Sequence, residues 1–146
     1  MTIGPETLIL LDTSVVLHLA RNDATGQAIE SEYSLTSRRD RPLISTITEG
    51  ELLGFAYYRQ WGQHKLEALR AMLDNFIRVD AGLPDVVERY AQLYAEAKRR
   101  GAPCGQNDLW IAATAKAAGA VLLTCDKDFA WLDPDYLTVF TVATVH

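Results

Sequence analysis

Four acidic residues stand at positions where an α/β protein can do chemistry. Asp12 and Asp126 directly follow two short apolar stretches that lack the alternation of a half-exposed strand. Glu51 and Asp108 fall in the first turns of two predicted helices. In an open parallel sheet, the carboxyl ends of the strands and the starts of the following helices lie on one edge. The sequence therefore predicts that the four carboxylates converge there.

Such a cluster predicts a site for a hard divalent cation. Carboxylates that converge repel one another, so either a cation bridges them or one of them takes up a proton. Oxygen ligands without histidine or cysteine favour Mg²⁺ or Mn²⁺. An ion of this kind polarises a phosphoryl oxygen and lowers the pKa of water. The reaction class that this chemistry indicates is phosphoester hydrolysis.

Each acid also has a purely structural interpretation. Asp12 and Asp126 can serve as helix N-caps, a role worth about 1 kcal/mol. Thr48 and Glu51, three residues apart, match a capping box. Local sequence leaves these interpretations open, and the shared sheet edge is what favours a metal site.

The elements that must position these acids alternate between strands and helices along the chain. Strands are predicted for residues 7–11, 42–45, 76–79, 120–124 and 136–142, the last as an edge strand. Helices are predicted for residues 15–21, from 46 to a break at 61–62, and for 65–73, 85–100 and 107–118, with a weaker helical pattern over 22–39 that breaks near Gly26. This order predicts an α/β fold with a mostly parallel sheet covered on both faces.

The helix predicted over residues 85–100 has the clearest amphipathic pattern of the chain. Its last turn is basic, and Gly101 follows as a C-cap. The inward stripe is predicted to contain Val86, Val87, Tyr90, Leu93, Tyr94 and Ala97.

Length and composition indicate one globular domain over residues 1–146, since 49% of the 146 residues are hydrophobic. No apolar run approaches the roughly 20 residues that span a bilayer, and the N-terminus lacks a signal-peptide pattern. We therefore expect a cytoplasmic protein without a membrane partner. The net charge of −5 argues against passive binding to a polyanion, unless cations recruited by the acids reverse the local sign. Cys104 and Cys125 are expected to be free thiols.

Four segments of the chain resemble a known family. They are LLDTSVVLHLA around Asp12, STITEGELLG around Glu51, NDLWIAATA around Asp108, and LLTCDKDF around Asp126 and Asp128. In order and spacing they resemble the PIN-domain ribonucleases, and within them the VapC toxins of bacterial toxin-antitoxin pairs.

This resemblance implies a single PIN-like, Rossmannoid α/β/α sandwich that uses Mg²⁺ or Mn²⁺ to cleave single-stranded or looped RNA. Asp12 and Asp108 match the principal metal ligands, and Glu51 matches the second acid. Asp126 matches the fourth acid, with Asp128 as the alternative. The residues that match supporting positions are Thr13 and Thr124, next to the acids, and Asn107, which can contact a phosphate.

The same resemblance implies protein partners. It implies a homodimer and a small cognate antitoxin, whose C-terminal segment covers the acids and inserts a basic side chain among them. The residues expected to form the antitoxin groove are Phe55, Tyr57, Tyr58 and Trp61.

Two departures and two other interpretations accompany the resemblance. Gly54 stands one residue earlier than the usual glycine, and Cys125 stands where a basic or polar residue is common. A receiver-like phospho-acceptor domain is also an α/β fold with acids at one edge, but it needs two adjacent acids where Asp12 is followed by Thr13. A catalytically silent binding protein of the same fold would keep the pocket only to hold a partner.

Overall fold

The computed structural model describes residues 2–146. Its centre is a five-stranded sheet in the order β3-β2-β1-β4-β5, and every neighbouring pair is parallel. The strands are β1 (Ile9–Leu11), β2 (Leu43–Ser45), β3 (Ile77–Val79), β4 (Val121–Thr124) and β5 (Val139–Thr141). All five lie inside the predicted ranges, so the prediction of a parallel α/β sheet is confirmed.

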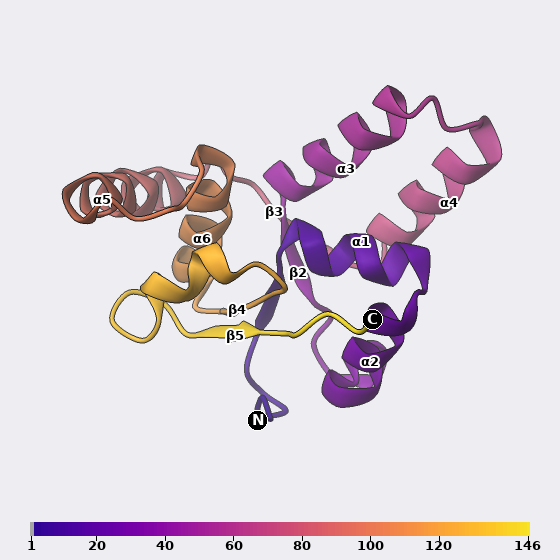
Figure 1. Ribbon diagram of the computed structural model, residues 1–146, viewed down its shortest axis with the longest axis horizontal. Coiled ribbons are helices and arrows are strands. Elements are labelled where there is room, and N and C mark those ends of the chain that lie inside the picture. Colours follow the sequence, from indigo (N-terminus) through magenta and orange to yellow (C-terminus); the bar gives the residue numbers. More distant parts are fainter. Residues whose placement is uncertain (1) are drawn as a thin grey trace.

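Helices cover both faces of this sheet (Figure 1). They are α1 (Thr13–Arg21), α2 (Ala24–Tyr33), η1 (Leu35–Ser37), α3 (Thr46–Tyr58), α4 (Gln63–Leu73), α5 (Pro84–Arg100), α6 (Gln106–Ala118) and η2 (Lys127–Leu132). In the part of the chain that the structure describes, no helix has the length and apolar character needed to cross a membrane.

Alternation along the strands divides the apolar core into two clusters. Leu10 and Leu122 face the cluster that contains α5 and α6, whereas Leu11 and Leu123 face the cluster that contains α1 to α4. Successive strand residues point to opposite faces, so a strand buried on both faces is apolar at every position. This explains why β1 and β4 have no polar alternation.

The chain order reverses between β1 and β4. From β1 the chain moves outward to β2 and β3, and then returns to place β4 on the other side of β1, with Leu11 in register with Leu123. Such a switch point opens a crevice at the carboxyl ends of the two strands, which is where ligands bind in open α/β sheets.

Two predictions about helix ends were wrong. The N-cap of α3 is Ser45, whose hydroxyl accepts a hydrogen bond from the Ile47 amide at 3.0 Å, so Thr48 and Glu51 form no capping box. Gly26 lies inside α2, and the break comes earlier, at Asn22 in a left-handed conformation.

The amphipathic stripe of α5 is narrower than predicted. Val86, Leu93 and Ala97 are buried, but Val87 and Tyr94 are each 44% exposed. The helix packs mainly on α6 and not directly on the sheet, so a single narrow face suffices to cover its neighbour.

Gly26 permits the close approach of α2 to α1. A Cβ atom at this position would lie 2.3 Å from the backbone oxygen of His18, whereas a Cβ atom at Gly54 in α3 would meet nothing within 4 Å. We expect Gly26→Ala to lower the free energy of unfolding by about 1–3 kcal/mol, because backbone must move. Gly54→Ala, the matched control, should raise it by about 0.4–1 kcal/mol. Urea denaturation measures both, and equal effects would contradict the close packing of the two helices.

Candidate active site

Asp12 lies at the end of β1, at the switch point of the sheet. Its side chain is only 4% exposed. The carboxylate accepts hydrogen bonds from the Ser14 and Thr124 hydroxyls, each at 2.7 Å. Burial raises the pKa of Asp12, and the two hydroxyls oppose that rise. Asp12 therefore joins the ends of the two central strands through a single carboxylate.

Glu51 is held from two sides, by α1 and by α6. The Thr13 hydroxyl donates to Glu51 Oε1 at 2.7 Å, and the Asn107 side-chain amide donates to Oε2 at 3.3 Å. The Thr13 hydroxyl also lies 3.0 Å from that of Thr48, which is buried one turn before Glu51. These contacts bring together the starts of α1, α3 and α6.

Asp126 follows β4 and begins the short helix η2. Its side chain accepts a hydrogen bond from the Asp128 amide at 2.9 Å, so its interpretation as an N-cap is confirmed. Its own amide donates to the Thr124 hydroxyl at 2.9 Å. Thr124 thus connects Asp12 with Asp126, while the Asp128 side chain is exposed at the rim.

Asp108 shows that the acids share one region. Its pKa is raised to about 6, first by burial and then by the negative charges of Asp12, Asp126 and Glu51. These three residues come from different segments of the chain, and their charges can act on Asp108 only because the fold brings the segments together. Hydrogen bonds give the same neighbourhood, since Thr124 contacts both Asp12 and the Asp126 amide, and Glu51 accepts from Asn107, the residue before Asp108. The four acids thus lie at the same edge of the sheet, and their convergence on one ion stays a prediction.

Among residues 2–146, no three or more histidine, cysteine, aspartate or glutamate side chains are grouped so that they could hold a metal ion. Glu51 is turned towards Thr13 and Asn107, and Asp126 towards its own helix. These two carboxylates are therefore each held by neighbouring donors. Their donor atoms are hard oxygens, which is the chemistry that Mg²⁺ and Mn²⁺ require. Their assignment as metal ligands remains a prediction.

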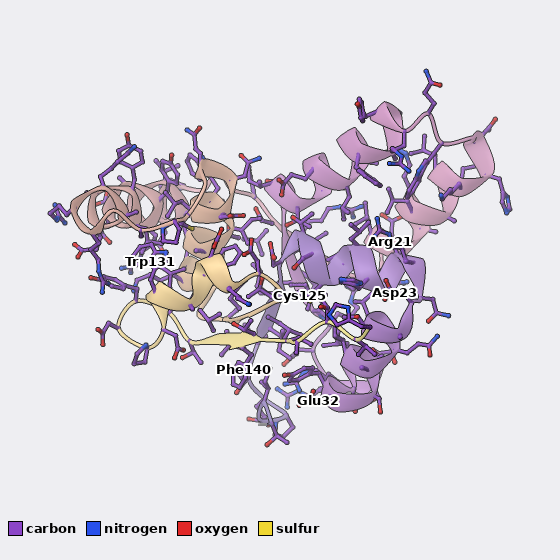
Figure 2. The ribbon with its side chains drawn as sticks, in the orientation of Figure 1. Arg21, Asp23, Glu32, Cys125, Trp131 and Phe140 are labelled. Carbon is purple, nitrogen blue, oxygen red and sulfur yellow. The ribbon has the colours of Figure 1, made fainter. Side chains whose placement is uncertain are left out.

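Two hydroxyl residues of this network, Ser14 and Thr48, were not predicted. Ser14 donates to Asp12 and accepts from the Cys125 amide at 3.1 Å, which ties the start of α1 to the end of β4. Figure 2 labels Cys125 at this junction. Thr48 was assigned to a cap, although its spacing of one turn from Glu51 also indicates a shared helix face. The two cysteines are free, as expected.

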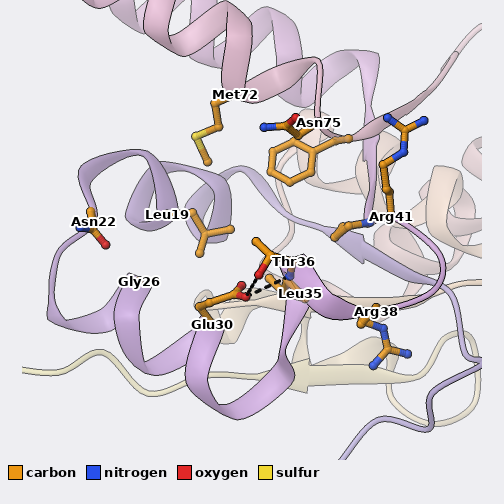
Figure 3. Close-up of a pocket in the computed structure, with 12 residues that line it drawn as sticks. Leu19, Asn22, Gly26, Glu30, Leu35, Thr36, Arg38, Arg41, Met72 and Asn75 are labelled. Atoms are coloured by element: carbon orange, nitrogen blue, oxygen red, sulfur yellow. Dashed lines mark hydrogen bonds between the residues drawn. The ribbon is translucent and has the colours of Figure 1, made fainter.

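Two hollows of the surface are lined by none of the four acids. One, of about 550 Å³, lies between α1, α2 and α4 and is lined by apolar residues such as Leu19, Met72 and Phe76, with Arg38 and Arg41 also on its wall (Figure 3). A second, of about 450 Å³, shares Met72 with it and is lined by Phe55 and Trp61. Both adjoin the α3–α4 side of the molecule.

Comparison with known proteins identifies the family. A family model described as the PIN domain matches residues 9–133. The chain is 30% identical, over 119 residues, to Ribonuclease VapC1 of Haemophilus influenzae (strain R2866), which covers 80% of this chain and 85% of the relative. The strain KW20 protein of the same name is 29% identical over the same length.

Solved structures share the same architecture. VapBC-1 from nontypeable Haemophilus influenzae matches with a TM-score of 0.75 at 26% identity, covering 92% of this chain and 97% of that one. VapBC2 from Rickettsia felis, solved with a DNA fragment from its promoter, matches with a TM-score of 0.78 at 20% identity, covering 92% and 98%. The second likeness concerns the fold alone. Because the PIN-domain model matches residues 9–133 and Ribonuclease VapC1 is 30% identical over 80% of this chain, the chain belongs to the PIN-domain family and, within it, to the VapC group.

Proposed function

We propose that this protein is a Mg²⁺- or Mn²⁺-dependent endoribonuclease and the toxin of a toxin-antitoxin pair. The observation that carries the proposal is the hydrogen-bond network at the switch point of the sheet, in which Thr124 joins Asp12 to Asp126 and Asn107, next to Asp108, donates to Glu51. Similarity to proteins named ribonuclease supports RNA as the substrate. The receiver-like alternative lacks support, because a single acid follows β1 and the chain belongs to another family.

In the proposed reaction the acids hold a divalent ion and the neighbouring polar groups orient them. Asp12 and Asp108 are the proposed principal ligands, and Glu51 and Asp126 complete the set, with Asp128 as the alternative to Asp126. The bound ion would supply charge against a phosphate oxygen and lower the pKa of the attacking water.

The chain's own hydrogen bonds fix which residues must move. Ser14 and Thr124 hold Asp12 in place, so its position is preset. For a third carboxylate to reach an ion beside Asp12 and Asp108, Glu51 would turn from Thr13, or Asp126 would offer Oδ2, since the Asp128 amide donates to its Oδ1. Asn107, released from Glu51 by such a turn, is exposed and free to donate to an RNA phosphate.

An antitoxin is the proposed protein partner, since the similar solved structures include VapBC complexes. The hollow that Phe55 and Trp61 line also contains Arg21, Arg59 and Lys65. Lys65 Nζ lies 4.0 Å from the ring centroid of Trp61. An apolar hollow edged by cations fits a peptide segment that carries both apolar and acidic side chains.

Two of the four expected groove residues are arranged differently. Tyr57 and Tyr58 are 58% and 83% exposed and are not part of this hollow, and the Tyr57 hydroxyl accepts a hydrogen bond from Arg70 at 2.7 Å. The proposed groove therefore rests on Phe55 and Trp61. The homodimer that the resemblance implies stays a prediction, which analytical ultracentrifugation of the purified chain tests.

Asp12→Asn and Asp108→Asn are each expected to reduce Mg²⁺- or Mn²⁺-dependent RNA cleavage by at least about 100-fold, since either removes a proposed ligand charge. The assay is the cleavage of a cellular RNA pool with and without Mn²⁺, with the new ends mapped. Asp135→Asn, at an exposed acid elsewhere in the chain, is the matched control and should cleave like the parent. Undiminished cleavage by either site variant would refute the assignment, and a parent that never cleaves would favour the catalytically silent alternative.

The pKa of Asp108 predicts how pH acts on activity and on stability. Because only the ionised carboxylate can hold the cation, cleavage at limiting Mg²⁺ should fall as the pH drops through about 6, and saturating Mg²⁺ should move this fall to lower pH. The folded pKa lies above the ordinary value of 3.8, so the folded chain binds the proton more tightly than the unfolded chain. The stability linked to Asp108 is therefore full below 3.8 and is lost as the pH rises through about 6.

Asp108→Asn removes the loss of stability that ionisation of Asp108 causes as the pH rises. Near neutral pH and without divalent ions, the variant should be more stable than the parent, by on the order of 2 kcal/mol, and the difference should vanish towards pH 4. Adding Mg²⁺ should raise the melting temperature of the parent more than that of the variant. Thermal denaturation with and without Mg²⁺ measures both, and a parent that is the more stable at neutral pH would contradict the prediction.

The proposed groove makes a prediction for growth. Expression of the chain should arrest growth, and co-expression of the cognate antitoxin should restore it. Trp61→Glu should remain toxic in the presence of the antitoxin, because a buried charge replaces an apolar wall. Arg70→Glu, also on the α3–α4 side but outside the hollow, should be neutralised like the parent. Full rescue of Trp61→Glu would exclude this hollow as the docking site.

A further inference from the structure

We propose that a hollow between the end of α5 and the start of α6 binds one nucleobase of the RNA strand. It rests on the proposed ribonuclease function and gives that function a site for a base beside the bond to be cleaved. The α5–α6 hollow has a volume of about 460 Å³ and is lined by residues that include Tyr94, Lys98, Ala102, Cys104, Gln106 and Leu109.

The α5–α6 hollow adjoins the acids. Cys104 belongs to its wall, and a Cβ atom on Gly105, the next residue, would lie 3.8 Å from Asp108 Oδ2. The Asp108 carboxylate therefore lies beside the wall of the hollow. Gln106, also on the wall, is the first residue of α6 and precedes Asp108 by two positions. A base in the hollow would thus leave its neighbouring phosphate near the proposed catalytic acids.

An aromatic ring is presented on the wall of the hollow. Tyr94 is 44% exposed, although the pattern of α5 predicts an inward position. The centroid of its ring lies 6.0 Å from that of Tyr90. Tyr90 in turn stacks on Trp110 of α6, with 3.8 Å between the ring centroids and an angle of 5° between the ring planes. This stack anchors the helix turn that carries Tyr94. A rigid and exposed ring is the platform on which proteins stack unpaired bases.

Lys98 supplies the charge that a nucleotide requires. Its ammonium lies 5.4 Å from the ring centroid of Tyr94. The other two cations of the last turn of α5 are engaged, since Arg99 pairs with Glu96 at 2.9 Å and Arg100 lies over Trp131 at 5.6 Å. The flexible stem of Lys98 lets the ammonium swing from the ring to a phosphate when a base takes its place. Lys98 can therefore bind a phosphate of the RNA backbone beside an otherwise acidic edge of the sheet.

Gln106 gives the hollow a means to distinguish bases. Its side-chain amide is exposed at the start of α6 and offers both a donor and an acceptor. A base stacked on Tyr94 presents its hydrogen-bonding edge to such a group, which is how single-stranded RNA is read. We therefore expect stacking to supply the affinity and Gln106 to supply the preference among bases.

A second copy of the chain is the competing occupant of this face, because Leu83 and Val87 of α5 are also exposed, at 47% and 44%. They lie towards the other end of the helix and do not line the hollow. The cation, the amide and the nearness of the acids favour a nucleotide at the Tyr94 end.

The test measures RNA binding in the Asp108→Asn background with Mg²⁺ present, by fluorescence anisotropy of labelled homohexamers of A, U and C. Tyr94→Ala should weaken binding by at least about fivefold, whereas Tyr94→Phe, which keeps the ring, should bind like the background. Val87→Ala, with equal exposure on the same helix, is the control and should have no effect. Circular dichroism melts of each variant confirm the fold.

Two further variants test the roles of charge and amide. Lys98→Glu should weaken all three homohexamers and reduce the salt slope by about 1, whereas the charge-matched Arg39→Glu, far from α5, should not. Gln106→Ala should reduce the differences among the three hexamers while Tyr94 still binds them.

The outcomes separate this proposal from the ribonuclease function. Cleavage by the parent with no change in KM for Tyr94→Ala, or equal binding by Tyr94→Ala and its background, would overturn the base site and leave the function standing. Binding that depends on Tyr94 in a parent that does not cleave would support the base site and reject the function. A change of sedimentation in Tyr94→Ala without a change in binding would assign the face to a second copy and overturn the proposal.

Discussion

Repulsion between carboxylates gathered at one sheet edge is the constraint on which this structure depends. The fold brings Asp12, Glu51, Asp108 and Asp126 to the same edge, where burial, and then the charges of the other three acids, raise the pKa of Asp108. Removing charge from this region would stabilise the folded chain, so stability alone gives no reason for the arrangement. An acidic cluster that the rest of the molecule must hold against its own repulsion indicates a functional site.

Hydroxyl groups hold Asp12 and Glu51, and among residues 2–146 no ion pair joins either acid to a cation. The hydroxyls of Ser14 and Thr124 hold Asp12, and the Thr13 hydroxyl holds Glu51. A neutral donor satisfies a carboxylate without cancelling its charge, so the cluster keeps its attraction for a divalent ion. A lysine or arginine at any of these positions would have neutralised the site. The serine and threonine hydroxyls therefore position the carboxylates and leave their negative charge available to a cation.

Sequence patterns predicted the sheet and the acids because both depend on local chemistry. A strand buried on both faces must be apolar throughout, and β1 and β4 follow that rule, with an acid after each. Contacts that depend on tertiary packing were less visible. The sequence predicts a helix break at Gly26, because it does not show that the His18 carbonyl packs against this glycine. It predicts a core position for Tyr94, because it does not show that α5 packs mainly on α6. Ser14 and Thr48 resemble ordinary surface hydroxyls in sequence, and only the fold shows which carboxylates they serve.

The pairing of β1 with β4 also sets an order of events during synthesis. The hydrogen bond from Thr124 to Asp12 joins residues 112 positions apart, and Leu11 has its β4 partner only when Leu123 is present. Contacts of such long sequence separation form late, after the intervening helices have been made. Until the ribosome has made β4, Asp12 has neither its strand partner nor the Thr124 hydroxyl, although Glu51 and Asp108 have already been synthesised. The acidic centre therefore forms only after β4 has left the exit tunnel.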